Sequence, residues 1–100
     1  MENSEVAKVF EDIARLLPRN KENIFKVRAY QKAARTITEF PEPVEKLVAE
    51  GRLREVPGVG EAIAKKITEL ITTGKLAFYE RLKSEANLHN NSSPSTGEAR

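Results

Sequence analysis

Residues 53–67 have the sequence Leu53-Arg54-Glu55-Val56-Pro57-Gly58-Val59-Gly60-Glu61-Ala62-Ile63-Ala64-Lys65-Lys66-Ile67. Two glycines, Gly58 and Gly60, stand one residue apart directly before apolar residues at helical spacing. Glycine has no Cβ, so the chain can turn sharply here and another molecule can approach the main chain closely. The first N–H groups of the following helix have no partner within it and lie at its positive dipole end. The stretch therefore predicts a turn whose exposed amides can donate to a phosphate oxygen.

The residues around the two glycines support this interpretation. Pro57 fixes one dihedral angle before the turn, Val56 and Val59 are expected to fill the core, and the small Ala64 lets two helices come close. Three basic side chains flank the glycines: Arg54, Lys65 and Lys66. A bare Pro-Gly-Val-Gly has an ordinary tight turn as its alternative. With this flanking pattern the stretch resembles a helix-hairpin-helix motif, which favours binding to the DNA backbone.

The remainder of the chain shows helical periodicity. Apolar residues recur at helical spacing over residues 3–17, 24–39, 43–50, 63–74 and 76–84, with one further turn at 52–56. No segment shows the alternating pattern of a strand at length. The sequence predicts an all-α fold, a compact bundle of four to five short helices that contains one helix-hairpin-helix motif.

The composition changes near residue 87. From there to residue 100 the chain consists mainly of Asn, Ser, Pro, Thr and Gly, with almost nothing apolar. Such a segment cannot offset the conformational entropy lost on ordering. We therefore expect one domain over residues 1–86, a helix-hairpin-helix DNA-binding domain, and a disordered polar tail over residues 87–100.

The length and composition of the chain exclude several classes of protein. One hundred residues with 39% hydrophobic and 32% charged residues suit a single globular domain and leave no room for a polymerase palm with its carboxylate cluster. No cysteine is present, so neither a disulfide framework nor a thiolate metal site can form. The sequence offers no membrane span and no signal peptide at its start. We expect a monomer in the cytoplasm, associated with the nucleoid, with no membrane partner and no required cofactor.

A family resemblance covers residues 4–85, which look like the N-terminal, lyase-type helix-hairpin-helix domain of family X DNA polymerases, the DNA polymerase beta-like group. The resemblance extends beyond the hairpin. Residues 25–34, Phe-Lys-Val-Arg-Ala-Tyr-Gln-Lys-Ala-Ala, are similar to the family's second-helix signature. The segment Thr73-Gly74-Lys75-Leu76 is similar to the turn after the hairpin helix.

The resemblance implies a function and a set of site residues. The family's domain binds the 5'-phosphate side of gapped DNA, and in some members a lysine removes a 5'-deoxyribose phosphate through a Schiff base. That nucleophile corresponds to Lys66. Lys26, Tyr30 and Arg54 correspond to positions at or beside the 5'-phosphate. The family's hairpin holds a monovalent cation, K+ or Na+, through backbone carbonyls that correspond to those of Arg54, Val56 and Val59.

Three positions depart from the family pattern. Phe25 and Ala62 stand where DNA polymerase beta-like domains carry a histidine and a lysine that help to hold the 5'-phosphate, and Lys65 replaces a glutamate. The phosphate pocket is therefore less charged. General affinity for DNA should remain, because it depends on the number of cations near the backbone more than on which position carries each.

The chemistry of Lys66 remains open at this point. A lysine amine attacks a sugar aldehyde only when it is unprotonated, which nearby cations and an apolar face would favour. Glu69, one turn further along the helix, would instead stabilise the ammonium form. Lys66 is thus either a nucleophile or a phosphate-contacting surface lysine. Tyr30 has a similar pair of interpretations, since it can steady the phosphate or the lysine, or fill the core.

Three functions follow as alternatives: binding of DNA without sequence specificity at gaps or 5'-phosphate ends in base excision repair, 5'-deoxyribose-phosphate lyase activity, and protein interaction. Expected partners are gapped, nicked or duplex DNA and a polymerase or nuclease. On residues 24–39, only Lys26 among the basic residues is expected to face the DNA. The expected phosphate-binding residues are Gly58, Val59, Gly60, Lys26, Tyr30, Arg54, Lys65 and Lys66.

Overall fold

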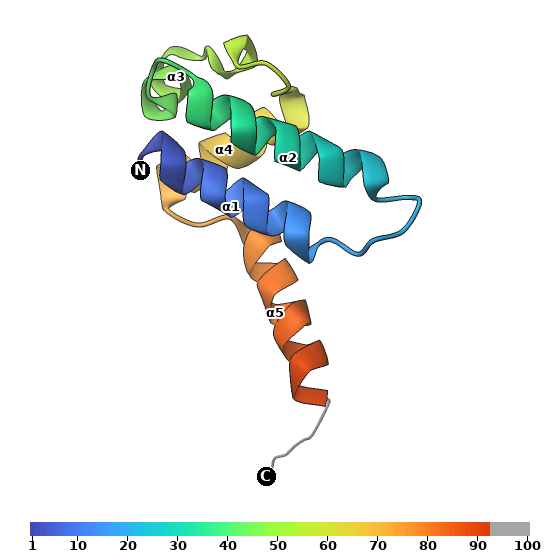
Figure 1. Ribbon diagram of the computed structural model, residues 1–100. Coiled ribbons are helices and arrows are strands. Elements are labelled where there is room, and N and C mark those ends of the chain that lie inside the picture. The colour runs from blue at the N-terminus through green and yellow to red at the C-terminus, as the bar shows by residue number, and fades with distance from the viewer. Residues whose placement is uncertain (93–100) are drawn as a thin grey trace.

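The structure is a computed structural model that describes residues 1–92. Its elements, in chain order, are α1 (Asn3–Leu16), α2 (Ile24–Glu39), α3 (Val44–Glu50), the single-turn 3-10 helix η1 (Leu53–Glu55), α4 (Glu61–Thr73) and α5 (Ala77–Ser92) (Figure 1). Residues 1–92 contain no strand. The prediction of an all-α bundle with one hairpin is therefore confirmed.

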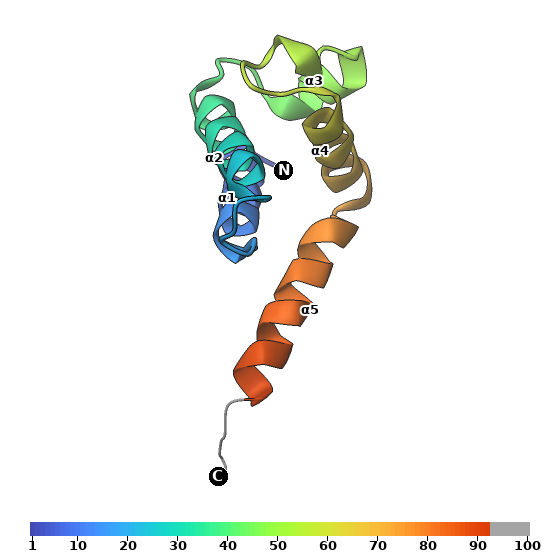
Figure 2. The ribbon, with the colours of Figure 1, turned by 90° about the vertical axis from the view of Figure 1, so that its right-hand side faces the viewer.

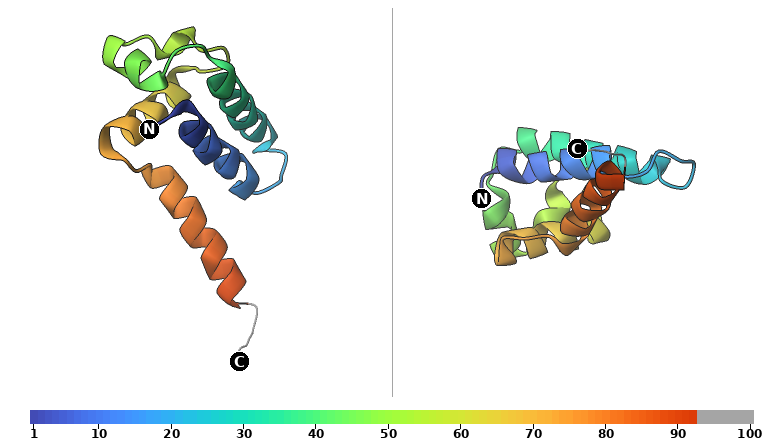
Figure 3. Two further views of the ribbon diagram at one scale, coloured as in Figure 1. Left: turned by 60° about the vertical axis from the view of Figure 1, so that its left-hand side comes forward. Right: turned by 90° about the horizontal axis from the view of Figure 1, so that it is seen from below.

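Helices α1 and α2 lie antiparallel and side by side (Figures 1 and 3). Each presents an apolar stripe to the other, as its helical spacing predicts. The ring of Phe10 on α1 stacks on that of Tyr30 on α2, with centroids 5.8 Å apart and planes inclined by 19°. Ala33 and Ala34 are buried on α2, and such small side chains allow the two helices to pack closely.

Helices α3 and α4, joined by η1 and the hairpin turn, form a second layer against this pair (Figure 2). The predicted core residues Val56 and Val59 are only 1% and 4% exposed. Buried side chains on both sides of Gly58 therefore hold the turn against the core. Buried residues from both layers meet in one cluster that includes Ile37, Leu47 and Ile67. The turn is therefore held by the body of the domain, although its main chain reaches the surface.

The start of α3 is fixed by a side chain from the first residue of α1. The Asn3 side chain donates through Nδ2 to the carbonyls of Ile37 and Glu42, at 3.2 and 2.9 Å, and accepts through Oδ1 from the amide of Val44 at 2.8 Å. This supplies a partner for one of the amides that every helix leaves free in its first turn. Asn3 thereby joins α1, the end of α2 and the start of α3.

Helix α5 is longer than the sequence predicts. The sequence places its end near Ser84 and a disordered tail from residue 87, whereas α5 continues to Ser92 and extends away from the other helices (Figures 1 and 3). The predicted end of this helix near Ser84 is therefore wrong, whereas the domain boundary at residue 87 stays a prediction. Once a helix has formed, each added residue gains a backbone hydrogen bond, so the helix can continue beyond the residues that pack against the domain. Residues 93–100 of the predicted tail lie outside the described residues.

Two hydrogen bonds to side chains of α1 and α4 help to hold α5 to the other helices. The amide of Ala77 donates to Glu69 Oε2 on α4 at 2.8 Å, and the Tyr79 hydroxyl donates to Asp12 Oδ2 on α1 at 2.7 Å. Leu76 and Leu82 are buried beside them. The first two turns of α5 are therefore part of the domain core.

The contact between Tyr79 and Asp12 predicts a loss of stability at alkaline pH. Burial, and next the hydrogen bond to the Asp12 carboxylate, raise the pKa of Tyr79 to about 12. Because this value exceeds the unfolded tyrosine pKa of about 10, the stabilisation is complete below about pH 10 and is lost as the pH rises towards 12. We expect Tyr79→Phe to reduce the free energy of unfolding by about 1 kcal/mol at neutral pH. Urea unfolding of both proteins should show this difference shrinking above about pH 10, and a constant difference would contradict the prediction.

Candidate nucleic-acid interface

The turn before α4 has the geometry that the two glycines predict. Gly58 has φ +82°, in the left-handed region that favours glycine, and the amide of Val59 donates to the carbonyl of Val56 at 3.1 Å. Gly60 is the N-cap residue of α4 and is extended, with φ −92° and ψ −169°. A Cβ on Gly60 would meet no atom within 4 Å. Conformation therefore requires glycine at residue 58, whereas at residue 60 the missing side chain only leaves the helix end open.

The main chain of this turn offers a group of free hydrogen-bond donors. No side chain caps α4, because its N-cap residue is glycine. Several amides donate to no atom of the described residues: those of Gly58, Gly60, Glu61, Ala62 and Ile63. They lie at the positive end of a 13-residue helix. This arrangement can accept an anion such as a phosphate oxygen.

Lys32 is a part of this site that the sequence analysis missed. A Cβ built on Gly58 would lie 3.1 Å from Cγ and Cδ of Lys32 and 3.2 Å from its Cε, so the lysine stem lies directly over the turn. The ammonium group, one bond beyond Cε, therefore lies at the hairpin. Nothing in the helical spacing of α2 separates Lys32 from its exposed neighbours, because the contact depends on how α2 packs against the turn.

The predicted basic residues come from three elements, η1, α2 and α4. Arg54 on η1 and Lys26 on α2 are exposed and form no ion pair with the side chains that the structure describes. Lys65 Nζ lies 3.6 Å from Glu61 Oε2, and both side chains are about three quarters exposed, so this ion pair is weak. Lys26 lies six residues before Lys32, about 9 Å along the helix. It is therefore further from the turn than Lys32.

Lys66 and Tyr30 come together around one aromatic ring. Lys66 Nζ lies 5.1 Å from the centroid of the Phe78 ring, and Arg81 Cζ lies 5.6 Å from it. The same ring stacks on Tyr30, with centroids 6.1 Å apart. The sequence analysis named neither Phe78 nor Arg81, because their proximity to Lys66 depends on the direction of α5.

The carboxylate expected to stabilise the Lys66 ammonium has another partner. Glu69 accepts from the amide of Ala77 and caps α5, as described above. Among the side chains that the structure describes, no carboxylate lies within ion-pair distance of Lys66. Glu69 and Lys66 therefore form no ion pair, and the effect of Glu69 on the Lys66 ammonium stays a prediction.

Tyr30 occupies a mainly structural position. Tyr30 is 7% exposed, and its ring lies between those of Phe10 and Phe78. Burial raises the pKa of its hydroxyl. The interpretation that the ring fills the core is confirmed. A contact between its hydroxyl and a phosphate stays a prediction.

An exposed apolar patch lies at the start of α2, where Phe25 is 75% and Ile24 43% exposed. Phe25 is one of the positions that depart from the family pattern. The two side chains border a pocket of about 620 Å³, whose lining residues are Arg19, Asn20, Lys21, Ile24, Phe25 and Val27. An aromatic face beside cations suits an unpaired nucleotide base.

Three further observations concern residues 1–92. No group of three or more His, Cys, Asp or Glu side chains is placed to hold a metal ion in this part of the chain. The helices described here are also too short or too polar to cross a membrane. At the hairpin, the carbonyls of Arg54 and Val59 accept no hydrogen bond from these residues, and that of Val56 accepts one, from Val59.

Comparison with known proteins agrees with the geometry of the turn. The family model described as a helix-hairpin-helix domain matches residues 1–76. DNA polymerase lambda of Arabidopsis thaliana is 35% identical over 57 residues, which are 57% of this chain and 10% of the relative. The chain thus spans about a tenth of the length of that protein. These findings bear out the resemblance to family X DNA polymerases, and the chain belongs to the helix-hairpin-helix domain family.

Proposed function

We propose that this domain binds the phosphate backbone of DNA without sequence specificity. The observation that carries the proposal is the group of free amides at the start of α4, with Lys32, Arg54 and Lys65 around it. Amides at a helix N-terminus and exposed cations both bind phosphate oxygens. Main-chain donors contact the backbone, which is alike at every base pair, so such contacts position the protein without reading bases.

The preferred DNA is a gap or a 5'-phosphate end in DNA repair. Two observations support this choice. The relative named DNA polymerase lambda contains a similar domain. The exposed ring of Phe25 next to Lys26 provides a surface on which an unpaired base can stack, which intact duplex does not supply. A gapped substrate presents a phosphate end and an unpaired base together.

The dependence of affinity on salt tests the proposal. Each neutralised phosphate releases counterions, so about three to five contacts predict a slope of about −3 to −5 in log K against log salt. We expect fluorescence anisotropy with a gapped duplex to give such a slope, with weaker binding to intact duplex. If the protein does not bind DNA, or binds it with an affinity that does not depend on salt, the protein-interaction alternative is favoured. The exposed patch of Ile24 and Phe25 would then be the interacting surface.

Lyase activity at Lys66 is the second candidate function, favoured by the surroundings of that side chain. Lys66 has a second cation, Arg81, at the same aromatic ring and no carboxylate partner among the described side chains. The Lys66 amine is therefore held by no ion pair with these side chains and lies beside an aromatic ring. The amine would add to the C1' aldehyde of a 5'-deoxyribose phosphate and lose water to form a Schiff base. Loss of a C2' proton and cleavage of the C3'–O bond would then release the 5'-phosphorylated DNA.

Borohydride trapping on a nicked duplex with a 5'-deoxyribose phosphate tests this second function. We expect a covalent adduct with the wild-type protein and none with Lys66→Ala. The matched control is Lys65→Ala, which removes the neighbouring lysine and should keep the adduct. Binding without any adduct in the wild type would leave the domain a DNA-binding module.

A monovalent cation at the hairpin is a further part of the proposal. Carbonyl oxygens suit K+ or Na+, and those of Arg54 and Val59 have both lone pairs free of hydrogen bonds from residues 1–92. With the carbonyl of Val56 they would hold a cation that adds positive charge beside the free amides. The affinity for gapped DNA should then be higher in K+ than in tetramethylammonium at equal ionic strength. Equal affinities in the two salts would contradict this cation site.

A further inference from the structure

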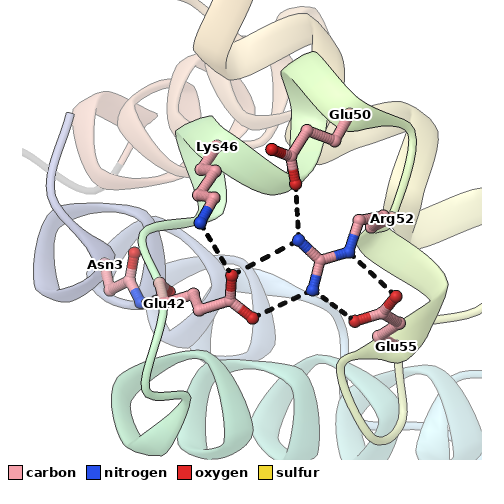
Figure 4. Close-up of polar contacts among 6 residues, drawn as sticks. All are labelled: Asn3, Glu42, Lys46, Glu50, Arg52 and Glu55. Atoms are coloured by element: carbon pink, nitrogen blue, oxygen red, sulfur yellow. Dashed lines mark hydrogen bonds and ion pairs between the residues drawn. The ribbon is translucent and has the colours of Figure 1, made fainter.

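One arginine near the hairpin is surrounded by carboxylates. Arg52 donates through Nε and Nη2 to both oxygens of Glu55, at 2.9 and 2.8 Å. Nη2 also donates to Glu42 at 3.0 Å, and Nη1 donates to Glu42 at 3.3 Å and to Glu50 (Figure 4). The guanidinium group has five N–H donors, and these five contacts use all of them. Arg52 therefore has no donor left for a phosphate.

The three carboxylates come from separate segments of the chain. Glu42 precedes α3, Glu50 is the last residue of α3, and Glu55 is the last residue of η1, directly before Val56. Lys46 adds a contact to Glu42 at 3.4 Å. The arginine thus ties η1 to both ends of α3 at the point where the hairpin turn begins.

The three carboxylates can lie close together only because the positive charge of Arg52 lies between them. Hydrogen bonds from its guanidinium group hold the pKa values of Glu42 and Glu55 below the usual range for glutamate. Without Arg52, three carboxylates would face one another, and like charges at this separation repel. Glu55 would then move away from Glu42 and take the first residues of the turn with it.

We propose that Arg52 is a positioning residue for phosphate binding, which fixes η1 and the turn so that the free amides at the start of α4 face one phosphate. Arg52 itself does not touch the DNA. This inference rests on the proposed binding of DNA at the hairpin. It assigns opposite roles to two arginines only two residues apart, since Arg54 is exposed, free of ion pairs with the described side chains and available to a phosphate.

The test compares Arg52→Lys with Arg54→Gln in their affinity for a gapped duplex over a series of salt concentrations. Lysine keeps the positive charge but loses the five-donor fork. We expect Arg52→Lys to bind about tenfold more weakly with an unchanged salt slope. Arg54→Gln should reduce the magnitude of the slope by about one, as expected when one phosphate contact is lost. Measurements well below the melting temperature, checked by circular dichroism, keep both variants folded.

Glu55→Gln provides a second variant, should Arg52→Lys fail to fold. It removes one negative charge, which by itself would strengthen binding to DNA, whereas loss of positioning weakens it. We expect weaker binding. Wild-type affinity in Arg52→Lys, a slope reduced by one in that variant, or tighter binding in Glu55→Gln would each overturn the role of Arg52. Absence of salt-dependent binding in the wild type would instead refute the proposed function.

Discussion

Replacing Gly58 by alanine is expected to weaken binding to gapped DNA by at least about tenfold and to destabilise the fold by about 1–2 kcal/mol. The first cause is the backbone, because φ at Gly58 is +82°. The second is space, because the new Cβ would lie 3.1 Å from the stem of Lys32. Relief of either strain moves the turn or displaces Lys32. Both changes separate a phosphate from the donors that we propose hold it.

The matched control is Gly74→Ala. Gly74 has nearly the same φ, +80°, but a Cβ there would meet no atom within 4 Å, and the residue ends α4 at the opposite end from the hairpin. The backbone cost in stability should therefore be similar. Urea unfolding and fluorescence anisotropy measure the two effects separately. Equal affinities for DNA in the two variants would show that the turn is not the binding site.

Phe10→Ala is expected to lower the free energy of unfolding by about 3–5 kcal/mol, a large share of the total for a domain of this size. Phe10 is fully buried between α1 and α2 and stacks on Tyr30, which in turn stacks on Phe78. Its loss leaves a cavity that two rigid helices cannot close. Thermal unfolding should show a decrease in Tm of about 15 °C or more.

Phe25→Ala is the control for this substitution. The same ring is removed from a side chain that is 75% exposed, so the free energy of unfolding should change by less than about 0.5 kcal/mol. The same variant should weaken binding to a gapped duplex. If Phe25→Ala destabilised the protein as much as Phe10→Ala, the assignment of the core would be wrong.

The sequence predicts most of this fold because the signals are local. Helix α2 has the predicted bounds of Ile24 and Glu39, since Pro41 and Pro43 prevent its continuation. Gly51 and Gly74 end α3 and α4 with positive φ, as glycine after a helix predicts. Helix α5 lacks such a signal, because the first glycine or proline after Gly74 is Pro94. The polar composition after residue 84 suggested that the helix ends there, but no helix-breaking residue stops it at that point.

The candidate site is predicted only in part. The two glycines and the basic residues beside them are close in sequence, so the spacing reveals them. Lys32, Phe78 and Arg81 come from other helices, and their contacts with the hairpin and Lys66 depend on packing between layers. Arg52 is the opposite case. A basic residue so close to the hairpin could bind a phosphate, but all its N–H groups donate to carboxylates.

The amides of the hairpin can be observed individually. A titration of the 15N-labelled protein with gapped DNA, followed by two-dimensional NMR, tests the central claim most directly. We expect the largest shifts at the amides of Gly58, Gly60, Glu61 and Ala62, with smaller changes near Arg52. Shifts confined to α3 and the surroundings of Arg52, with the hairpin amides unchanged, would contradict binding of phosphate at the turn.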